Sequence, residues 1–97
     1  MLVHLVLVKL KPGVSPTDPR VPAWEAKLKE LQHKCPGIVR FECGFNFTDR
    51  PVAYDIGINM AFDTKENLLA YGPHPAHQEV VVMLREIADW IICDYEA

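Results

Sequence analysis

The segment from Leu2 to Leu10 constrains the fold more than any other part of the chain. It is rich in β-branched and apolar residues and is followed by Pro12-Gly13, which predicts a β-strand that ends there. The apolar residues fall on both faces instead of alternating, as is typical of a strand that is covered on both sides. One of these faces carries Leu2, His4, Val6, Val8 and Leu10. We therefore expect a sheet with something packed against each face.

Two later stretches have the two-residue period of half-buried strands. Between Ile38 and Phe47 apolar residues alternate with polar residues or glycine, and between Tyr54 and Phe62 large apolar residues alternate with Asp55, Gly57, Asn59 and Ala61. Val39, Phe41, Cys43, Phe45 and Phe47 are expected to share one face of the first stretch. The connection through Thr48–Pro51 is short, so the two strands are expected to form a hairpin.

The remaining segments have helical periodicity, apart from the end of the chain. Apolar residues at three- and four-residue spacing predict a helix over 21–35, which Pro36-Gly37 ends. A short turn of helix at 66–71 precedes Gly72-Pro73, and a long helix is expected from Pro75 to about Asp89. A final strand is expected over 90–95. The order β-α-β-β-α-β predicts a single α+β domain, residues 1–97, of the ferredoxin-like type with a four-stranded antiparallel sheet.

In this arrangement both main helices cover the same face of the sheet. The other face would be open in a monomer, and we expect its side chains to include Phe and Val, which are too apolar to remain in contact with water. A second copy of the chain is the simplest cover. The sequence therefore predicts a homodimer in which two sheets pack face to face.

Composition excludes several classes of function. The 97 residues carry a formal charge of −3 without a basic cluster, which argues against nucleic-acid and membrane partners. The opening apolar run is too short to span a bilayer and does not resemble a secretion signal, so we expect a cytoplasmic protein. Three cysteines, Cys35, Cys43 and Cys93, match no zinc or redox motif.

Chemistry is most plausible in the stretch Tyr71–Glu79, where the last helix begins. His77 lies one turn into this helix, at the head of an apolar stripe, and Tyr71 lies just before the Gly-Pro break. The stripe comprises Val80, Val81, Leu84, Ile87, Ala88 and Ile91. His77 is therefore expected to be a titratable ring at the buried edge of a helix, with a phenol nearby.

Structural roles for the same residues remain open. His4 can be a hydrogen-bonded core residue, Tyr71 can simply pack its ring, and His77 can bond the chain that enters the helix. His74 can cap the helix. His74 and His77 are spaced to share a helix face, but no third metal ligand is evident, so we expect no metal. Phosphate-binding glycine loops are also absent, and we expect no cofactor.

The chain resembles the stress-responsive α/β-barrel (Dabb) family over essentially its whole length. The residues that carry the resemblance are Val3–Lys11, the turn Cys35-Pro36-Gly37-Ile38, Tyr54-Asp55, the element Tyr71-x-x-His74-Pro-x-His77-Gln78 and the closing Asp94-Tyr95. The resemblance implies a dimeric α+β barrel. It does not imply one activity, because some members are stress-associated proteins without an assigned reaction.

A polyketide cyclase of this family implies one specific chemistry. That enzyme closes a linear poly-β-ketone by aldol condensation without a metal or cofactor, and its working groups correspond here to His4, Tyr71 and His77. His77 would be the base, Tyr71 would donate to the carbonyl oxygen, and His4 would orient His77 or a substrate oxygen. The pocket is expected to include Val6, Val81, Leu84 and Ile56, and Ile56 stands where the cyclase has a further histidine. The alternatives are a non-catalytic stress-associated or small-molecule-binding barrel and a cofactor-free monooxygenase on the same fold.

Overall fold

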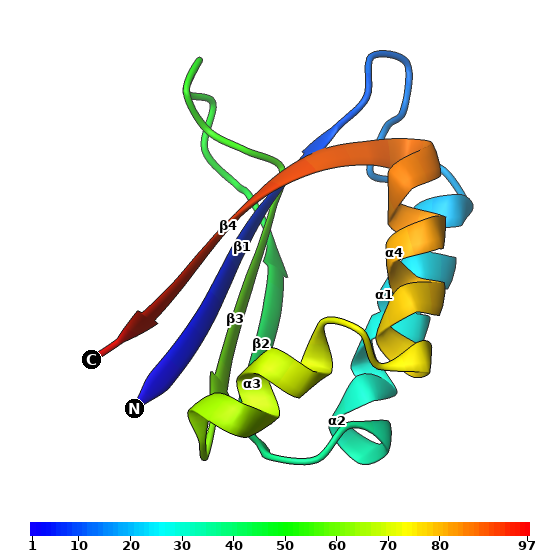
Figure 1. Cartoon of the computed structure of the whole chain (residues 1–97). Coiled ribbons are helices and arrows are strands. Elements are labelled where there is room, and N and C mark those ends of the chain that lie inside the picture. Colours follow the sequence, from blue (N-terminus) through cyan, green and yellow to red (C-terminus); the bar gives the residue numbers. More distant parts are fainter.

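The computed structural model describes all 97 residues as a sheet with helices against one of its faces (Figure 1). Both termini lie at the same end of the neighbouring strands β1 and β4, where Met1 and Ala97 hydrogen-bond each other. The elements are β1 (Leu2–Leu10), α1 (Arg20–Lys29), α2 (Leu31–Lys34), β2 (Ile38–Phe45), β3 (Ile56–Phe62), α3 (Lys65–Tyr71), α4 (Pro75–Ile87) and β4 (Ala88–Glu96). The predicted ferredoxin-like α+β class is confirmed.

The sheet is antiparallel throughout and has the strand order β2-β3-β1-β4. The apolar strand β1 is therefore central, paired with β3 on one side and β4 on the other. His4 is the position that matters for the site, because it lies between Met60 of β3 and Asp94 of β4. This register places His4 of the first strand directly beside Asp94 of the last strand.

The core lies between the helices and the inner face of the sheet. The side of β1 that carries Val6 and Val8 is buried, together with Trp24 and Leu28 of α1 and with Val80 and Leu84 of α4. Helices α1 and α4 pack side by side over this face (Figure 1). No helix of the chain has the length and apolar character that crossing a membrane requires.

The structure corrects several predicted boundaries. The helix expected over 21–35 is divided at Glu30, where His33 bonds the Glu30 carbonyl in a tighter turn before α2 continues. Helix α4 ends at Ile87, two residues early, and Ala88 already has extended backbone. Ile91 therefore belongs to β4 and not to the helical stripe, because strand pairing with β1 takes over at Ala88.

A register shift at the start of β2 changes which residues share a face. Ile38 pairs with Phe62 but Arg40 pairs with Ala61, so one residue is inserted between them. As a result Val39 is exposed, and Ile38 packs against the core instead. The prediction that Val39 shares the face of Phe41 was wrong, because strict alternation cannot anticipate a bulge.

The open face is apolar, but its composition differs from the expectation. Phe41 packs against the core on the helix side, opposite Met60, so the expected phenylalanine cover of the open face was wrong. The apolar side chains that are at least partly exposed there come from the pairing of β1 and β4, and they are Leu5, Leu7, Ile91, Cys93 and Tyr95. Alternation along a strand shows which residues share a face of the sheet. It does not show which of the two faces the helices cover.

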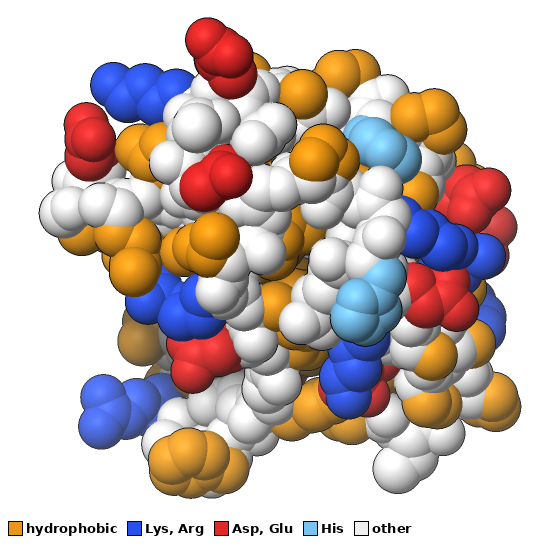
Figure 2. All heavy atoms as spheres, turned by 90° about the horizontal axis from the view of Figure 1, so that it is seen from below, with side chains coloured by type: hydrophobic (Ala, Val, Ile, Leu, Met, Phe, Trp, Pro, Cys, Tyr) orange, Lys and Arg blue, Asp and Glu red, His pale blue; other side chains and the backbone are white.

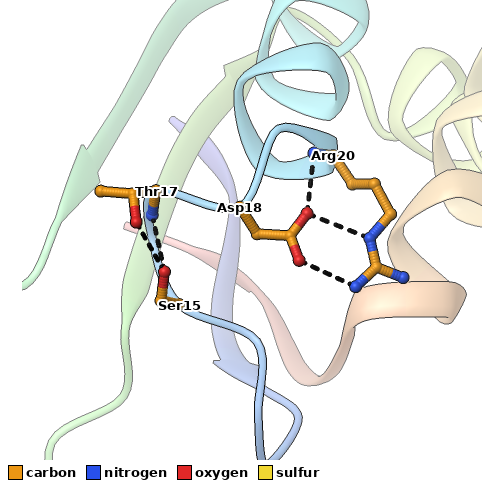
Figure 3. A network of polar contacts seen from close by, with 4 residues as sticks. All are labelled: Ser15, Thr17, Asp18 and Arg20. Atoms are coloured by element: carbon orange, nitrogen blue, oxygen red, sulfur yellow. Dashed lines mark hydrogen bonds and ion pairs between the residues drawn. The ribbon is translucent and has the colours of Figure 1, made fainter.

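The start of α1 is fixed by a local polar network (Figure 3). Asp18 accepts hydrogen bonds from the Arg20 backbone N–H and from its guanidinium, at 3.0 Å for the backbone and at 3.1 and 2.9 Å for the side chain. These bonds lower the pKa of the Asp18 carboxyl to about 2. One turn further on, Trp24 is directed into the core.

Candidate functional site

The site is built around the first turn of α4. His74 is the residue before the helix, and its side chain accepts a hydrogen bond from the Ala76 N–H at 3.1 Å, so the expected capping role is confirmed. Pro75 occupies the first helical position, where its missing N–H costs nothing. These two residues fix the start of the helix and therefore the direction of His77.

The ring of His77 is held by the main chain. Its Nδ1 lies 2.9 Å from the carbonyl oxygen of Gly72, and the side-chain amide of Gln78 donates to the same oxygen at 2.7 Å. Because a carbonyl oxygen can only accept, Nδ1 carries the proton, and Nε2 is the nitrogen with a free lone pair. Burial lowers the pKa of His77, the bond to Gly72 partly opposes this, and the charges of His4 and His74 add to the lowering. The ring is therefore a neutral proton acceptor near pH 7.

Tyr71 is the last residue of α3 and links the two histidines. Its ring centroid lies 4.2 Å from that of His77 and 5.6 Å from that of His4, and the side chain is buried. Burial raises the pKa of the phenol, and the Cys35 thiol, if ionised, raises it further. The hydroxyl therefore remains protonated and can act only as a neutral hydrogen-bond donor or acceptor.

His4 has a partner that the sequence analysis did not identify as part of the site. Its Nδ1 lies 2.5 Å from Oδ1 of Asp94, the residue opposite it on β4. His4 is the one buried polar residue of the core, and this carboxylate orients its ring. The predicted ferredoxin-like fold contained the necessary signal, since the first and last strands are neighbours in a sheet of this type.

An apolar cavity of about 50 Å³ lies between α4, α1 and the inner face of the sheet. It is bounded by His4, Val6, Trp24, Leu28, Ile58, Met60, Tyr71, His77, Val80, Val81, Leu84, Trp90 and Ile92. All three proposed working residues and three of the four expected pocket residues therefore surround one space. Seen from below, hydrophobic side chains lie in a hollow near histidine side chains (Figure 2).

The structure also corrects the expected lining. Ile56 does not border the cavity: it is buried opposite Val8, further along β3, and Ile58 takes its place. Trp24 and Trp90 are part of the wall and were not predicted. Trp24 is completely buried, and its indole Nε1 has no acceptor within the protein. Its place on the buried stripe of the first helix was visible in the sequence, but its place beside the histidines was not.

Metal ligation finds no support in the geometry. His74 uses its Nδ1 to cap the helix and His77 uses its own to bind Gly72, and no group of three His, Cys, Asp or Glu side chains is arranged to hold an ion. Cys35, Cys43 and Cys93 are free thiols. The ionisable groups that line the cavity are the imidazoles of His4 and His77 and the phenol of Tyr71, and the Asp94 carboxylate bonds His4 from outside it.

This fold and site define a ferredoxin-like α+β protein with an acid–base cluster between its sheet and its last helix. The chain belongs to the stress-responsive A/B barrel domain family, whose pattern it matches over residues 2–97. It is 45% identical over 96 residues to an uncharacterized protein of Streptomyces coelicolor, with 99% of each chain covered. A dimeric ferredoxin-like protein of unknown function from Jannaschia sp. CCS1 is 28% identical, with a TM-score of 0.81 over 99% of this chain and 98% of that one.

Some more distant proteins of this fold are enzymes. The hydroxynitrile lyase of Passiflora edulis is 16% identical, with a TM-score of 0.82 over 97% of this chain and 90% of that one. SnoaB, a cofactor-independent oxygenase from Streptomyces nogalater, is 12% identical, with a TM-score of 0.73 over 99% and 91%. At these identities the likeness shows the fold alone.

Proposed function

We propose that this protein is a cofactor-independent acid–base enzyme that acts on an enolisable carbonyl compound, with the aldol-type cyclisation of a poly-β-ketone as its reaction. One observation carries the proposal: the Gly72 carbonyl fixes the tautomer of His77 beside a buried phenol and an apolar cavity. A neutral imidazole is suited to removing the acidic proton between two carbonyl groups near neutral pH.

In this mechanism Nε2 of His77 takes a proton from the methylene carbon between two carbonyl groups. The Tyr71 hydroxyl donates a hydrogen bond to the oxygen on which the enolate charge develops. The enolate carbon then attacks another carbonyl carbon of the same chain, a carbon–carbon bond forms, and the new alkoxide takes the proton back from His77. The Nδ1–H of His4 donates to Asp94, so its Nε2 is left to accept a hydrogen bond from an enol hydroxyl of the substrate.

The volume of the cavity limits how the substrate lies. A cavity that holds benzene has a volume of about 150 Å³, whereas this one has about 50 Å³. Only the reacting portion of a polyketone is therefore enclosed in this conformation. We expect the rest to extend past Trp90 and Ile92, two lining residues on β4 of which the first is half-buried and the second exposed.

The protein is proposed to act as a homodimer in the cytoplasm. Leu7 and Ile91 pair side by side on the open face of the sheet, and both are exposed in a single chain. An apolar patch of this kind marks an interaction surface. Solved relatives that are described as dimeric share the fold.

The small enclosed volume also favours a second candidate, a barrel that binds a small molecule without transforming it. In that case His77 and His4 hold the cavity open and stabilise the packing. The two candidates differ in what the His77 ring does once a carbonyl compound is bound, so a variant of this residue separates them.

The test is the variant His77→Ala, assayed by mass spectrometry for cyclisation of linear poly-β-ketones. The mechanism predicts a loss of at least about 100-fold in kcat/KM, as is typical for a removed general base. His33→Ala, at an exposed position on α2, is the matched control and should retain full activity. Equal turnover by the wild type and His77→Ala would show that His77 is not the catalytic base. The small-molecule-binding barrel would then be the remaining candidate.

A further inference from the structure

We propose that the substrate is a linear keto acid whose carboxylate binds at Arg85, at the far end of α4 from His77. The inference rests on the proposed function for the identity of the reacting group at His77. The carboxylate subsite follows from different residues and can be tested by binding alone.

Trp90 connects the cavity to a second hollow on the surface. Its side chain is part of the cavity wall, and it also borders an open groove of about 380 Å³ that is lined by Lys11, Arg85, Ala88, Asp89 and Trp90. The guanidinium carbon of Arg85 lies 6.0 Å from the centroid of the Trp90 ring. A ligand that extends out of the cavity past Trp90 would therefore lie next to the Arg85 guanidinium.

Two cations at this groove have no acidic partner. The seven ion pairs of the protein involve neither Arg85 nor Lys11. The Lys11 ammonium donates to the backbone carbonyl of Arg85 at 2.8 Å, which holds it next to this turn of helix. A guanidinium that no carboxylate of the chain occupies is free to bind one from a ligand in the two-bonded manner that this group favours.

The one acidic residue of the groove does not cancel this charge. Asp89 lines the groove with Lys11 and Arg85 but forms an ion pair with neither, so two cations stand against one carboxylate. It lies across from Lys9 in the strand register. The groove next to the apolar cavity therefore has a net positive charge, which comes from Lys11 and Arg85.

The spacing along α4 sets the length of the ligand. His77, Val81 and Arg85 are four residues apart and lie in one row along the helix, and Val81 borders the cavity between them. Eight residues at about 1.5 Å each separate the two ends, which gives about 12 Å. A linear chain of this length places its enolisable methylene at His77 and its carboxylate at Arg85.

The experiment compares a charged probe with its neutral counterpart. The probe is a hexanoate chain that ends in an acetylacetone group, and the counterpart is the methyl ester of the same compound. Dissociation constants are measured by calorimetry for the wild type and for Arg85→Gln. Arg50→Gln is the control, because it removes one positive charge from the loop between β2 and β3, which does not line the groove.

We expect the acid to bind the wild type about ten-fold more tightly than the ester. Arg85→Gln should remove this preference by weakening the acid alone, and Arg50→Gln should keep it. Equal binding of acid and ester by the wild type, a preference retained in Arg85→Gln, or no binding of either probe would each overturn the proposal. If the preference depends on Arg85 while His77→Ala turns over normally, the keto-acid site stands and the catalytic mechanism fails.

Discussion

Both faces of the sheet carry apolar side chains, but those side chains are in different states in a single chain. On the inner face, Val6, Val8 and Phe62 are buried under the helices, with one small cavity left beside Tyr71. On the outer face, Leu7 and Ile91 are apolar side chains in contact with solvent. On the inner side the chain itself supplies most of the burial, whereas on the outer side the proposed homodimer would supply it.

The comparison separates two sources of stability. Contacts of the inner face act within the folded unit and should not depend on protein concentration. Contacts of the outer face form only on association and should follow mass action. Substitutions on the two faces are therefore expected to affect different observables, and the three predictions below test this separation.

Phe62→Ala should have the largest effect on stability. Phe62 is only 2% exposed and packs against Tyr71 with ring centroids 5.2 Å apart. Its truncation removes contacts and leaves a cavity, and we expect the free energy of unfolding to fall by about 3–5 kcal/mol. The measurement is urea denaturation at a fixed protein concentration. Phe47→Ala, at a residue that is 97% exposed, should change the same quantity by less than about 0.5 kcal/mol.

Ile91→Lys should break the dimer while leaving the monomer folded. Ile91 is 53% exposed in the single chain, so lysine is tolerated there, but a face-to-face dimer would bury the added charge. We expect the dimer dissociation constant to rise at least about 100-fold, measured by light scattering across a dilution series.

Val82→Lys is the matched control for this prediction. Val82 is 57% exposed, nearly the same as Ile91, but it lies on α4, on the other side of the molecule from the open face. It should leave the dissociation constant unchanged. Dissociation caused equally by both variants would mean that the dimer does not use the open face.

The pH dependence of stability should show the smallest effect and arises on the inner face. Burial holds the pKa of His77 below its ordinary value of 6.5, so in acid the unfolded chain binds a proton that the folded chain does not. The contribution of this residue is therefore complete above pH 6.5 and is lost as the pH falls from 6.5 to the folded-state pKa. Urea denaturation on both sides of pH 6.5 should show a decline that is weaker in His77→Gln. An identical decline in the variant would assign it to other groups.

The sequence contained most of the fold because periodicity and chain order are local. The central strand, the hairpin and the start of α4 at Pro75 were all predictable from short windows. The bulge at Val39 and the early end of α4 were not, because pairing with distant strands decides them. No local pattern reports that Ala88 is already extended.

The candidate site was predictable in part for the same reason. His77 and Tyr71 are close in sequence, and the apolar stripe predicted their buried setting. Their proximity to His4 followed only from the family resemblance. The bond between His4 and Asp94 and the two tryptophans of the cavity wall depend on strand register and helix packing. The strand order of a ferredoxin-like sheet could have suggested the bond between His4 and Asp94. Nothing in the sequence suggested that the two tryptophans border the cavity.

In the proposed mechanism, the bond from His77 to the Gly72 carbonyl separates proton transfer from ligand selection. The nitrogen that accepts the proton is chosen by a peptide group, which every amino acid possesses, and not by another side chain that mutation can exchange. Residues around the cavity can therefore diversify among descendants of one ancestor without altering which lone pair is available. A scaffold of this kind can acquire new substrates by changing its walls while it retains its base.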